Sequence, residues 1–166
     1  LIKSSELAKN IKNIEIDLNN SFFIIFDKTY KVKEFNYKNN GKIKKADLEF
    51  KRSFENSLLE EQIKQFSIIN SEIQTNFSPK NNTISIFGKY SLNKSNFLSF
   101  NLERVVKKEI LKLKLNADYD KFIQLDFINY QKPKNLIGNF SVNLEKQKDN
   151  IKIENLNFIE GKNSFK

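Results

Sequence analysis

The sequence predicts a mainly all-β fold, an antiparallel meander with one or two short helices. Three observations lead to this prediction. Apolar and polar residues alternate with a period of two in segment after segment, as on strands that bury one face. Clusters of Asn, Lys, Ser and Gly separate these segments, and short turns between consecutive strands make an antiparallel meander. The 16 Phe and 5 Tyr supply apolar area for folding, whereas the chain has only 4 Gly and 2 Pro.

The first half of the chain is strand-like but irregular. Apolar residues predict strands over residues 14–26, 30–37 and 48–50. Asn39-Asn40-Gly41 predicts a hairpin turn, because Asn and Gly tolerate the positive φ angles that such turns require.

Two segments of the same half predict helices. One covers residues 2–10, and the other covers residues 55–69, where apolar residues recur at helical offsets. Ser53 or Asn56 is placed to cap the second helix. The apolar residues that would form its buried face are Leu58, Leu59, Ile63 and Phe66.

Residues 84–166 alternate more regularly and define the candidate site. Successive side chains of a strand point to opposite faces, so the apolar residues at every second position of a segment lie on one face. We call this set of alternate positions the apolar parity of the segment. A one-residue slip after Ile153 predicts a bulge near Asn155. Polar clusters predict turns at residues 93–95, 131–135, 148–150 and 161–163. The candidate site residues are Ile84, Ile86, Tyr90, Leu92, Leu98, Phe100, Leu102, Leu111, Leu113, Leu115, Ile123, Leu125, Phe127, Phe140, Val142, Leu144, Ile151, Ile153, Leu156 and Phe158.

Two glycine-containing segments resemble each other. Gly88-Lys-Tyr-Ser-Leu-Asn93 and Gly138-Asn-Phe-Ser-Val-Asn143 share Gly, Ser and Asn and keep the apolar positions. The match indicates either a repeat of a few strands or a coincidence in a biased alphabet. In both segments Gly allows a close approach, with an aromatic residue two positions later on the same face.

The composition argues against an enzyme. Cys and His are absent, which removes thiol and imidazole nucleophiles, His bases and Cys/His zinc sites. Gly41, Gly88, Gly138 and Gly161 lie too far apart for a phosphate-binding loop. Asp118 and Asp120 have a spacing that suits a shared cation, but a solvated turn is the more ordinary interpretation. We therefore expect no catalytic residue, metal site or cofactor.

The net charge of +9 is a weak indication of nucleic-acid binding. Only Arg52 and Arg104 are arginines among the 29 basic residues, and phosphate recognition usually recruits Arg. The lysines are dispersed along the chain rather than clustered. We expect no nucleic-acid partner, although a basic binding module stays an alternative.

The apolar face has two interpretations from its pattern alone. It is either the sealed core of a sandwich or barrel, in a structural or adhesive domain without a ligand, or a groove for an apolar ligand. An open groove would expose the Leu and Phe residues, whereas a structural domain would pack them against a second sheet.

The closing segment resembles a known family. The stretch Gly138-Asn-Phe-Ser-Val-Asn-Leu-Glu145, followed by Asp149-Asn-Ile-Lys-Ile-Glu-Asn-Leu-Asn-Phe-Ile-Glu-Gly161, is similar to the repeated strand pairs of the AsmA-like family of envelope proteins. The resemblance covers residues 84–166, and the first half matches only in general character. It implies a curved antiparallel β-sheet or meander that forms an open groove. It also implies that residues 1–166 are a single β-rich domain and a fragment of a longer repeat protein.

The resemblance also implies a location and a function. It places the protein in the bacterial periplasm or cell envelope, anchored to the inner membrane by a segment outside this chain. The candidate site residues would line a concave face that binds acyl chains and supports phospholipid transport between inner and outer membranes. The expected partners are a phospholipid or another acyl-chain lipid, together with proteins of the two membranes.

Overall fold

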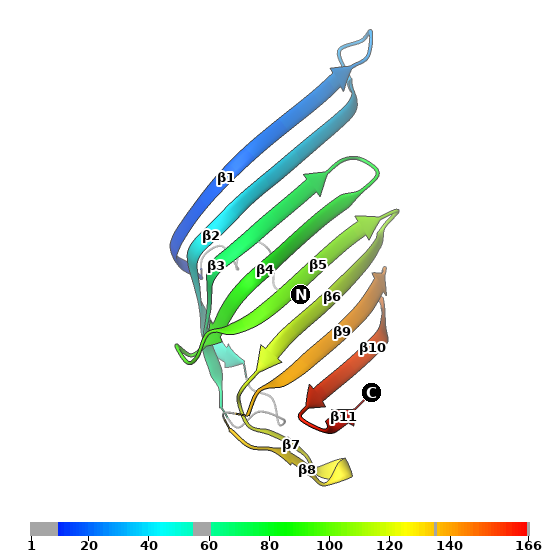
Figure 1. Cartoon of the computed structure of the whole chain (residues 1–166). Coiled ribbons are helices and arrows are strands. Elements are labelled where there is room, and N and C mark those ends of the chain that lie inside the picture. Colours follow the sequence, from blue (N-terminus) through cyan, green and yellow to red (C-terminus); the bar gives the residue numbers. More distant parts are fainter. Residues whose placement is uncertain (1–9, 55–60, 135, 166) are drawn as a thin grey trace.

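A single antiparallel meander organises the chain. The computed structural model describes residues 10–54, 61–134 and 136–165 (Figure 1). Nine strands form one sheet in the order β1-β2-β3-β4-β5-β6-β9-β10-β11, and β7 and β8 form a separate two-stranded sheet. The strands are β1 (Ile11–Phe26), β2 (Val32–Phe54), β3 (Ile63–Phe77), β4 (Asn82–Leu92), β5 (Leu98–Lys107), β6 (Ile110–Tyr119), β7 (Ile123–Leu125), β8 (Tyr130–Lys132), β9 (Gly138–Gln147), β10 (Asn150–Glu160) and β11 (Asn163–Phe165). The predicted antiparallel β fold is confirmed.

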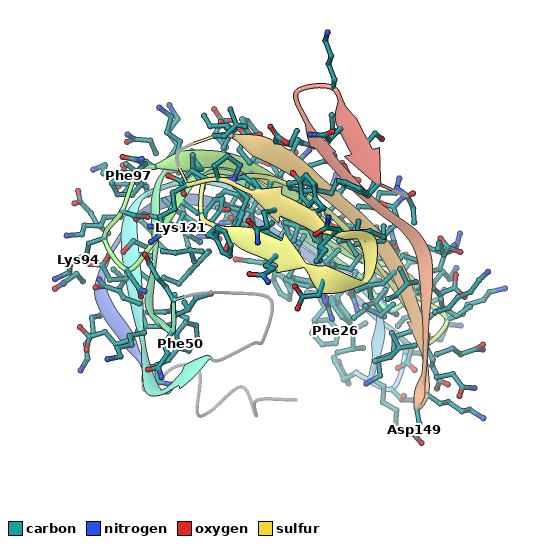
Figure 2. All side chains as sticks on the ribbon, turned by 90° about the horizontal axis from the view of Figure 1, so that it is seen from below. Phe26, Phe50, Lys94, Phe97, Lys121 and Asp149 are labelled. Atoms are coloured by element: carbon teal, nitrogen blue, oxygen red, sulfur yellow. The ribbon has the colours of Figure 1, made fainter. Side chains whose placement is uncertain are left out.

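The sheet is curved, with one concave and one convex face. Seen from below in Figure 2, the strands bend into an arc, and Phe26 and Phe50 lie on its inner side. The hairpin β7–β8 lies on the same inner side. The turns β1–β2, β3–β4, β5–β6 and β9–β10 all lie along one edge of the arc (Figure 1), which we call the turn rim.

Few apolar side chains are fully buried. Within the described residues, the buried apolar side chains are those of Ile43, Ala46, Tyr90 and Phe158. Because the large sheet is a single layer, the strands hold together mainly through their backbone ladders and cross-strand pairs. The described part of the chain has no helix suited to crossing a membrane.

The predicted hairpin turn at Asn39-Asn40-Gly41 is wrong. These residues lie inside β2 and pair with Asn20, Asn19 and Leu18 of β1. The turn comes earlier, where the Asp27 carboxylate accepts hydrogen bonds from the backbone N–H groups of Thr29 and Lys31 at 2.7 and 3.0 Å. An Asp side chain that accepts a hydrogen bond from the backbone two residues ahead stabilises a turn without Asn-Gly.

The helix predicted over residues 55–69 is wrong where the structure describes it. Ile63 and Phe66 belong to β3, and Phe66 pairs with Leu48 on one side and Leu92 on the other. Although their spacing favours a helix, β3 pairs with β2 on one edge and β4 on the other, and this pairing satisfies its backbone hydrogen-bonding groups. Leu58 and Leu59 lie outside the described residues.

Other expectations have mixed outcomes. The helix predicted over residues 2–10 falls on residues outside the described part, apart from Asn10. The bulge near Asn155 is confirmed by a register shift between β9 and β10 after Ile153. Residues 123–127 do not form a strand of the meander: β7 pairs only with β8, and a short 3-10 helix over Asp126–Ile128 follows it.

Candidate functional site

The predicted parity places a continuous apolar row on one face of the sheet. Residues directly opposite each other on neighbouring strands share a face. Such pairs connect six strands, from β3 to β10, without a polar interruption. The row consists of Ile73, Ile86, Leu102, Leu115, Val142 and Leu156.

Flanking rows extend this apolar surface. Phe100, Ala117, Phe140 and Phe158 lie opposite one another in succession on one side of the row. On the other side, Leu113, Leu144 and Ile153 are paired in the same way. The candidate site residues of β4, β5, β6, β9 and β10 are therefore brought together on one face.

This face is the concave one. The inner residues Phe26 and Phe50 have the parity of the apolar rows of β1 and β2, and β7–β8 packs on the same side (Figure 2). On the convex face the side chains are mostly polar, and Lys112 forms an ion pair with Glu145 at 3.0 Å. The curvature thus turns the apolar parity inward and the polar parity outward.

Most of the concave apolar side chains keep contact with solvent. Ile151 and Ile153 on β10 are 64% and 61% exposed, and Phe22 on β1 is 63% exposed. The central strands carry half-buried side chains on this face, and among the candidate residues whose side chains the structure describes only Tyr90 and Phe158 are buried. Within the described residues, the face is not packed against a second large sheet.

An aromatic cluster lies on this face near the strand ends that are opposite the turn rim. The Tyr90 ring stacks on Phe66 with ring centroids 5.8 Å apart and meets the Phe100 ring edge-on at 5.9 Å. The Tyr90 hydroxyl donates a hydrogen bond to the backbone carbonyl of Asp118 at 2.5 Å. Burial raises the pKa of Tyr90, so the hydroxyl stays protonated and keeps donating.

Both glycines of the similar segments allow a close approach on this face. A Cβ built at Gly88 would overlap Ser71 of β3, and one at Gly138 would overlap the Phe158 ring of β10. As predicted, an aromatic side chain lies two residues later on the same face in each strand, Tyr90 in β4 and Phe140 in β9.

The β7–β8 hairpin packs on one end of the concave face. The Tyr130 ring lies 4.5 Å from the Phe165 ring and 6.2 Å from the Phe158 ring, measured between centroids. The Tyr130 hydroxyl also donates to the Glu160 carboxylate at 2.9 Å. Ile123 and Leu125 are therefore part of this hairpin rather than of the apolar rows, and the side chain of Phe127 lies outside the described part.

A buried cation holds the base of the hairpin. Lys132 is fully buried, and its ammonium group donates to the carbonyls of Lys121 at 2.7 Å and Pro133 at 3.1 Å. Burial lowers the pKa of Lys132, and the nearby Asp120 carboxylate opposes that shift. The contacts are local, and they fix the hairpin against the end of β6, where Lys132 Nζ lies 5.7 Å from the centre of the Tyr119 ring.

Asp118 and Asp120 do not act as a carboxylate pair. Asp118 accepts a hydrogen bond from Asn139 at 3.1 Å, and Asp120 accepts one from Asn96 at 2.9 Å. The expected solvated turn is wrong for Asp120, which is buried, accepts the hydrogen bond from Asn96 and acts electrostatically on the Lys132 ammonium group. The described residues contain no cluster of carboxylates that could hold a metal ion.

The sequence prediction missed two groups of residues on this face. The first lies on β1–β3, where the alternation was interrupted by a misassigned turn and helix, and includes Leu18, Phe22, Tyr37, Ile68 and Ile73. The second consists of two cations, Arg104 and Lys146, which have the apolar parity of β5 and β9.

The comparisons with known proteins add no relative. A scan against models of protein families found no matching family, and searches of curated proteins and of solved structures found no match. The functional proposal is therefore based on the geometry of the concave face.

Proposed function

We propose that the concave face binds the acyl chains of lipids, and that the chain is a segment of a bacterial envelope protein that supports phospholipid transport between the inner and outer membranes. The observation that carries the proposal is the continuous apolar row whose neighbours remain exposed, such as Ile151 and Ile153. Exposed apolar surfaces of this extent are unusual in soluble proteins and mark binding sites. The curved sheet is also consistent with the fold that the AsmA-like resemblance implies.

The dimensions and chemistry of the row suit an acyl chain. From Ile73 to Leu156 it crosses five strand spacings, about 24 Å at the usual spacing of neighbouring strands. The hydrocarbon of one bilayer leaflet is about 15 Å thick, half of a whole core. Methylene groups need no hydrogen-bond partners, and covering apolar surface contributes about 25 cal/mol per Å². One extended acyl chain thus fits along the row.

The structural-domain alternative requires another layer over this face. Among the described residues only the hairpin β7–β8 packs there, through the contacts of Tyr130 with Phe158 and Phe165. Nucleic-acid binding is supported less, because convex lysines such as Lys44 and Lys112 are paired with carboxylates. Lipid binding on the concave face is the function that the geometry supports best.

A photo-crosslinking experiment tests this proposal. A photoreactive amino acid replaces either Leu113 or Lys112, neighbours on β6 whose side chains point to opposite faces. The purified protein is incubated with phospholipid vesicles that carry a labelled acyl chain, and then irradiated. We expect labelling from position 113 and background labelling from position 112. Phe100 with Asn101, and Phe140 with Asn139, provide further matched pairs on β5 and β9.

A charge on the concave face separates an open face from a sealed core. In Leu113→Asp the new carboxylate can reach water if the face is open, so the variant should stay folded by circular dichroism while labelling from position 100 falls. In a sealed core the same change would bury an unpaired charge and unfold the domain. Equal labelling from both parities, or a folded Leu113→Asp variant with unchanged labelling, would contradict the proposal.

A further inference from the structure

We propose that Arg104 and Lys146 form a binding site for an anionic phosphate headgroup at the turn rim of the concave face. The ligand class would then be an acyl-chain lipid whose phosphate headgroup carries a net negative charge. This inference rests on the proposed function and specifies which lipid the face prefers.

Both cations lie on the apolar face. Arg104 has the same parity as Phe100 and Leu102 on β5, and Lys146 has the same parity as Val142 and Leu144 on β9. Each of them is half-buried, and each is flanked on both neighbouring strands by apolar residues. The directly opposite residues are Ile84 and Leu113 for Arg104, and Leu111 and Ile151 for Lys146.

Neither cation has a carboxylate partner within the described part of the chain. Other basic residues do: Lys44 lies 3.1 Å from both Glu15 and Asp17, and Lys112 lies 3.0 Å from Glu145. A charged group beside apolar side chains loses hydration and gains most from an ion of opposite sign. The missing counter-charge can be supplied by an anionic ligand that covers the same face.

Their position along the strands fits an amphiphile. Arg104 lies three residues before the end of β5, and Lys146 one residue before the end of β9, next to turns on the turn rim (Figure 1). β6 lies between them, and two strand spacings combined with an offset of two residues separate their Cα atoms by about 12 Å. The long stems of both side chains allow their charges to converge over Leu111 and Leu113.

The chemistry of the two groups favours phosphate. Arg presents a planar fork that binds two phosphate oxygens at once, and Lys adds a flexible point charge. With the headgroup held at the rim, an acyl chain would cross the flanking row of Leu113 and Leu144 and then lie along the central row. Zwitterionic phospholipid could bind by its chains alone, but its positive group would lie beside the two cations.

A lipid competition experiment tests the inference. The full chain is incubated with vesicles containing equal amounts of phosphatidylglycerol and phosphatidylcholine with matched acyl chains, repurified, and analysed for bound lipid by mass spectrometry. We expect phosphatidylglycerol to be enriched in the wild type. In the double variant Arg104→Gln/Lys146→Gln the ratio of the two lipids should fall by about tenfold, the loss expected for charge-assisted contacts. The total amount of bound acyl chain should change much less.

The matched control removes the same charge from the opposite face. Lys89 and Lys114 are exposed, and their parity places them on the convex face of β4 and β6. The variant Lys89→Gln/Lys114→Gln should retain the lipid ratio of the wild type. An equal fall in this control would overturn the inference, since net charge alone would then explain the preference. An unchanged ratio in Arg104→Gln/Lys146→Gln would overturn it too.

Two further measurements keep the test decisive. If the double variant does not fold, the single variants Arg104→Gln and Lys146→Gln are compared with the wild type, and each should lower the ratio. In the wild type, the enrichment should decrease as salt is added, because exposed charges are screened. Binding of both lipids without a preference would reject the headgroup site and leave the proposed function intact, whereas absence of both lipids would reject the proposed function itself.

Discussion

Truncating Ile153 and Phe158 should destabilise the protein by very different amounts, although both lie on the concave face of β10. Ile153 is 61% exposed, so folding removes only about two fifths of its surface from water. Ile153→Ala deletes three carbon atoms, worth about 2.4 kcal/mol when fully buried, and the partial burial reduces the cost to about 1 kcal/mol.

Phe158 has a different environment on the same strand. It is 6% exposed and contacts the rings of Tyr130 and Phe165. Phe158→Ala leaves a cavity beside Gly138, and such truncations cost about 3–5 kcal/mol. Comparing the losses of unfolding free energy in Ile153→Ala and Phe158→Ala thus shows whether the concave face is covered only near the hairpin β7–β8.

Urea unfolding of the lipid-free protein, followed by circular dichroism, measures both free energies of unfolding. If the dependence of the unfolding free energy on urea concentration has the same slope in the variants and the wild type, a shift of the transition midpoint reports a change in stability. A cost of 3 kcal/mol or more for Ile153→Ala would refute the reasoning, since a loss of this size requires a packed layer over the concave face. A cost below about 1 kcal/mol for Phe158→Ala would refute the packing of the hairpin.

Three other changes have defined outcomes. The hydrogen bond with Ser67 is the main factor that lowers the pKa of Asp47 below its ordinary value of 3.8. The ionised Asp47 carboxylate therefore stabilises the fold above pH 3.8, and this stabilisation is lost as the pH falls through the folded-state pKa. Asp47→Asn should therefore lower stability at pH 7 and flatten its acid dependence between pH 5 and 2; unfolding curves that keep the wild-type acid dependence would contradict this. Tyr130→Phe removes the hydrogen bond to Glu160 and should cost about 1 kcal/mol in urea unfolding, whereas no change would show that water replaces this bond fully. Phe23 is 56% exposed on the edge strand β1, so Phe23→Lys should reduce concentration-dependent association in analytical ultracentrifugation, and association equal to that of the wild type would exclude this edge as the contact.

The second half of the sheet could be predicted because its strands pair with their neighbours in the chain. The alternation of Leu111, Leu113 and Leu115 determines which face is apolar, and the two-residue turn Lys148-Asp149 fixes the register of β9 against β10. The openness of the face could not be predicted this way. An alternating strand has the same pattern whether its apolar side faces a second sheet or solvent.

The strands of the first half could not be predicted from neighbouring residues alone, because their structure depends on pairing with strands that are distant in the sequence. β3 is held between β2 and β4, and Ile68 lies opposite Ala46 on one strand and Tyr90 on the other. Local spacing favoured a helix there, and tertiary pairing overrode it. The hairpin β7–β8 was missed for the same reason, since its position depends on Tyr130 reaching Phe158, 28 residues later in the chain.

Arg104 and Lys146 show that the sequence contained one more signal. The apolar parity of residues 98–102 continues through Arg104 to Val106, and that of residues 140–144 continues to Lys146. Each predicted apolar segment ended at its last apolar residue, so the cation that follows at the same parity was left out of the candidate site. A strand does not end because one inward position is charged, as the backbone ladder through Lys107 and Gln147 demonstrates. Under the proposed headgroup site, a cation that keeps the apolar parity near the end of a strand, with no acidic residue opposite, is the sequence signal for an anion-binding site at the rim of an apolar face.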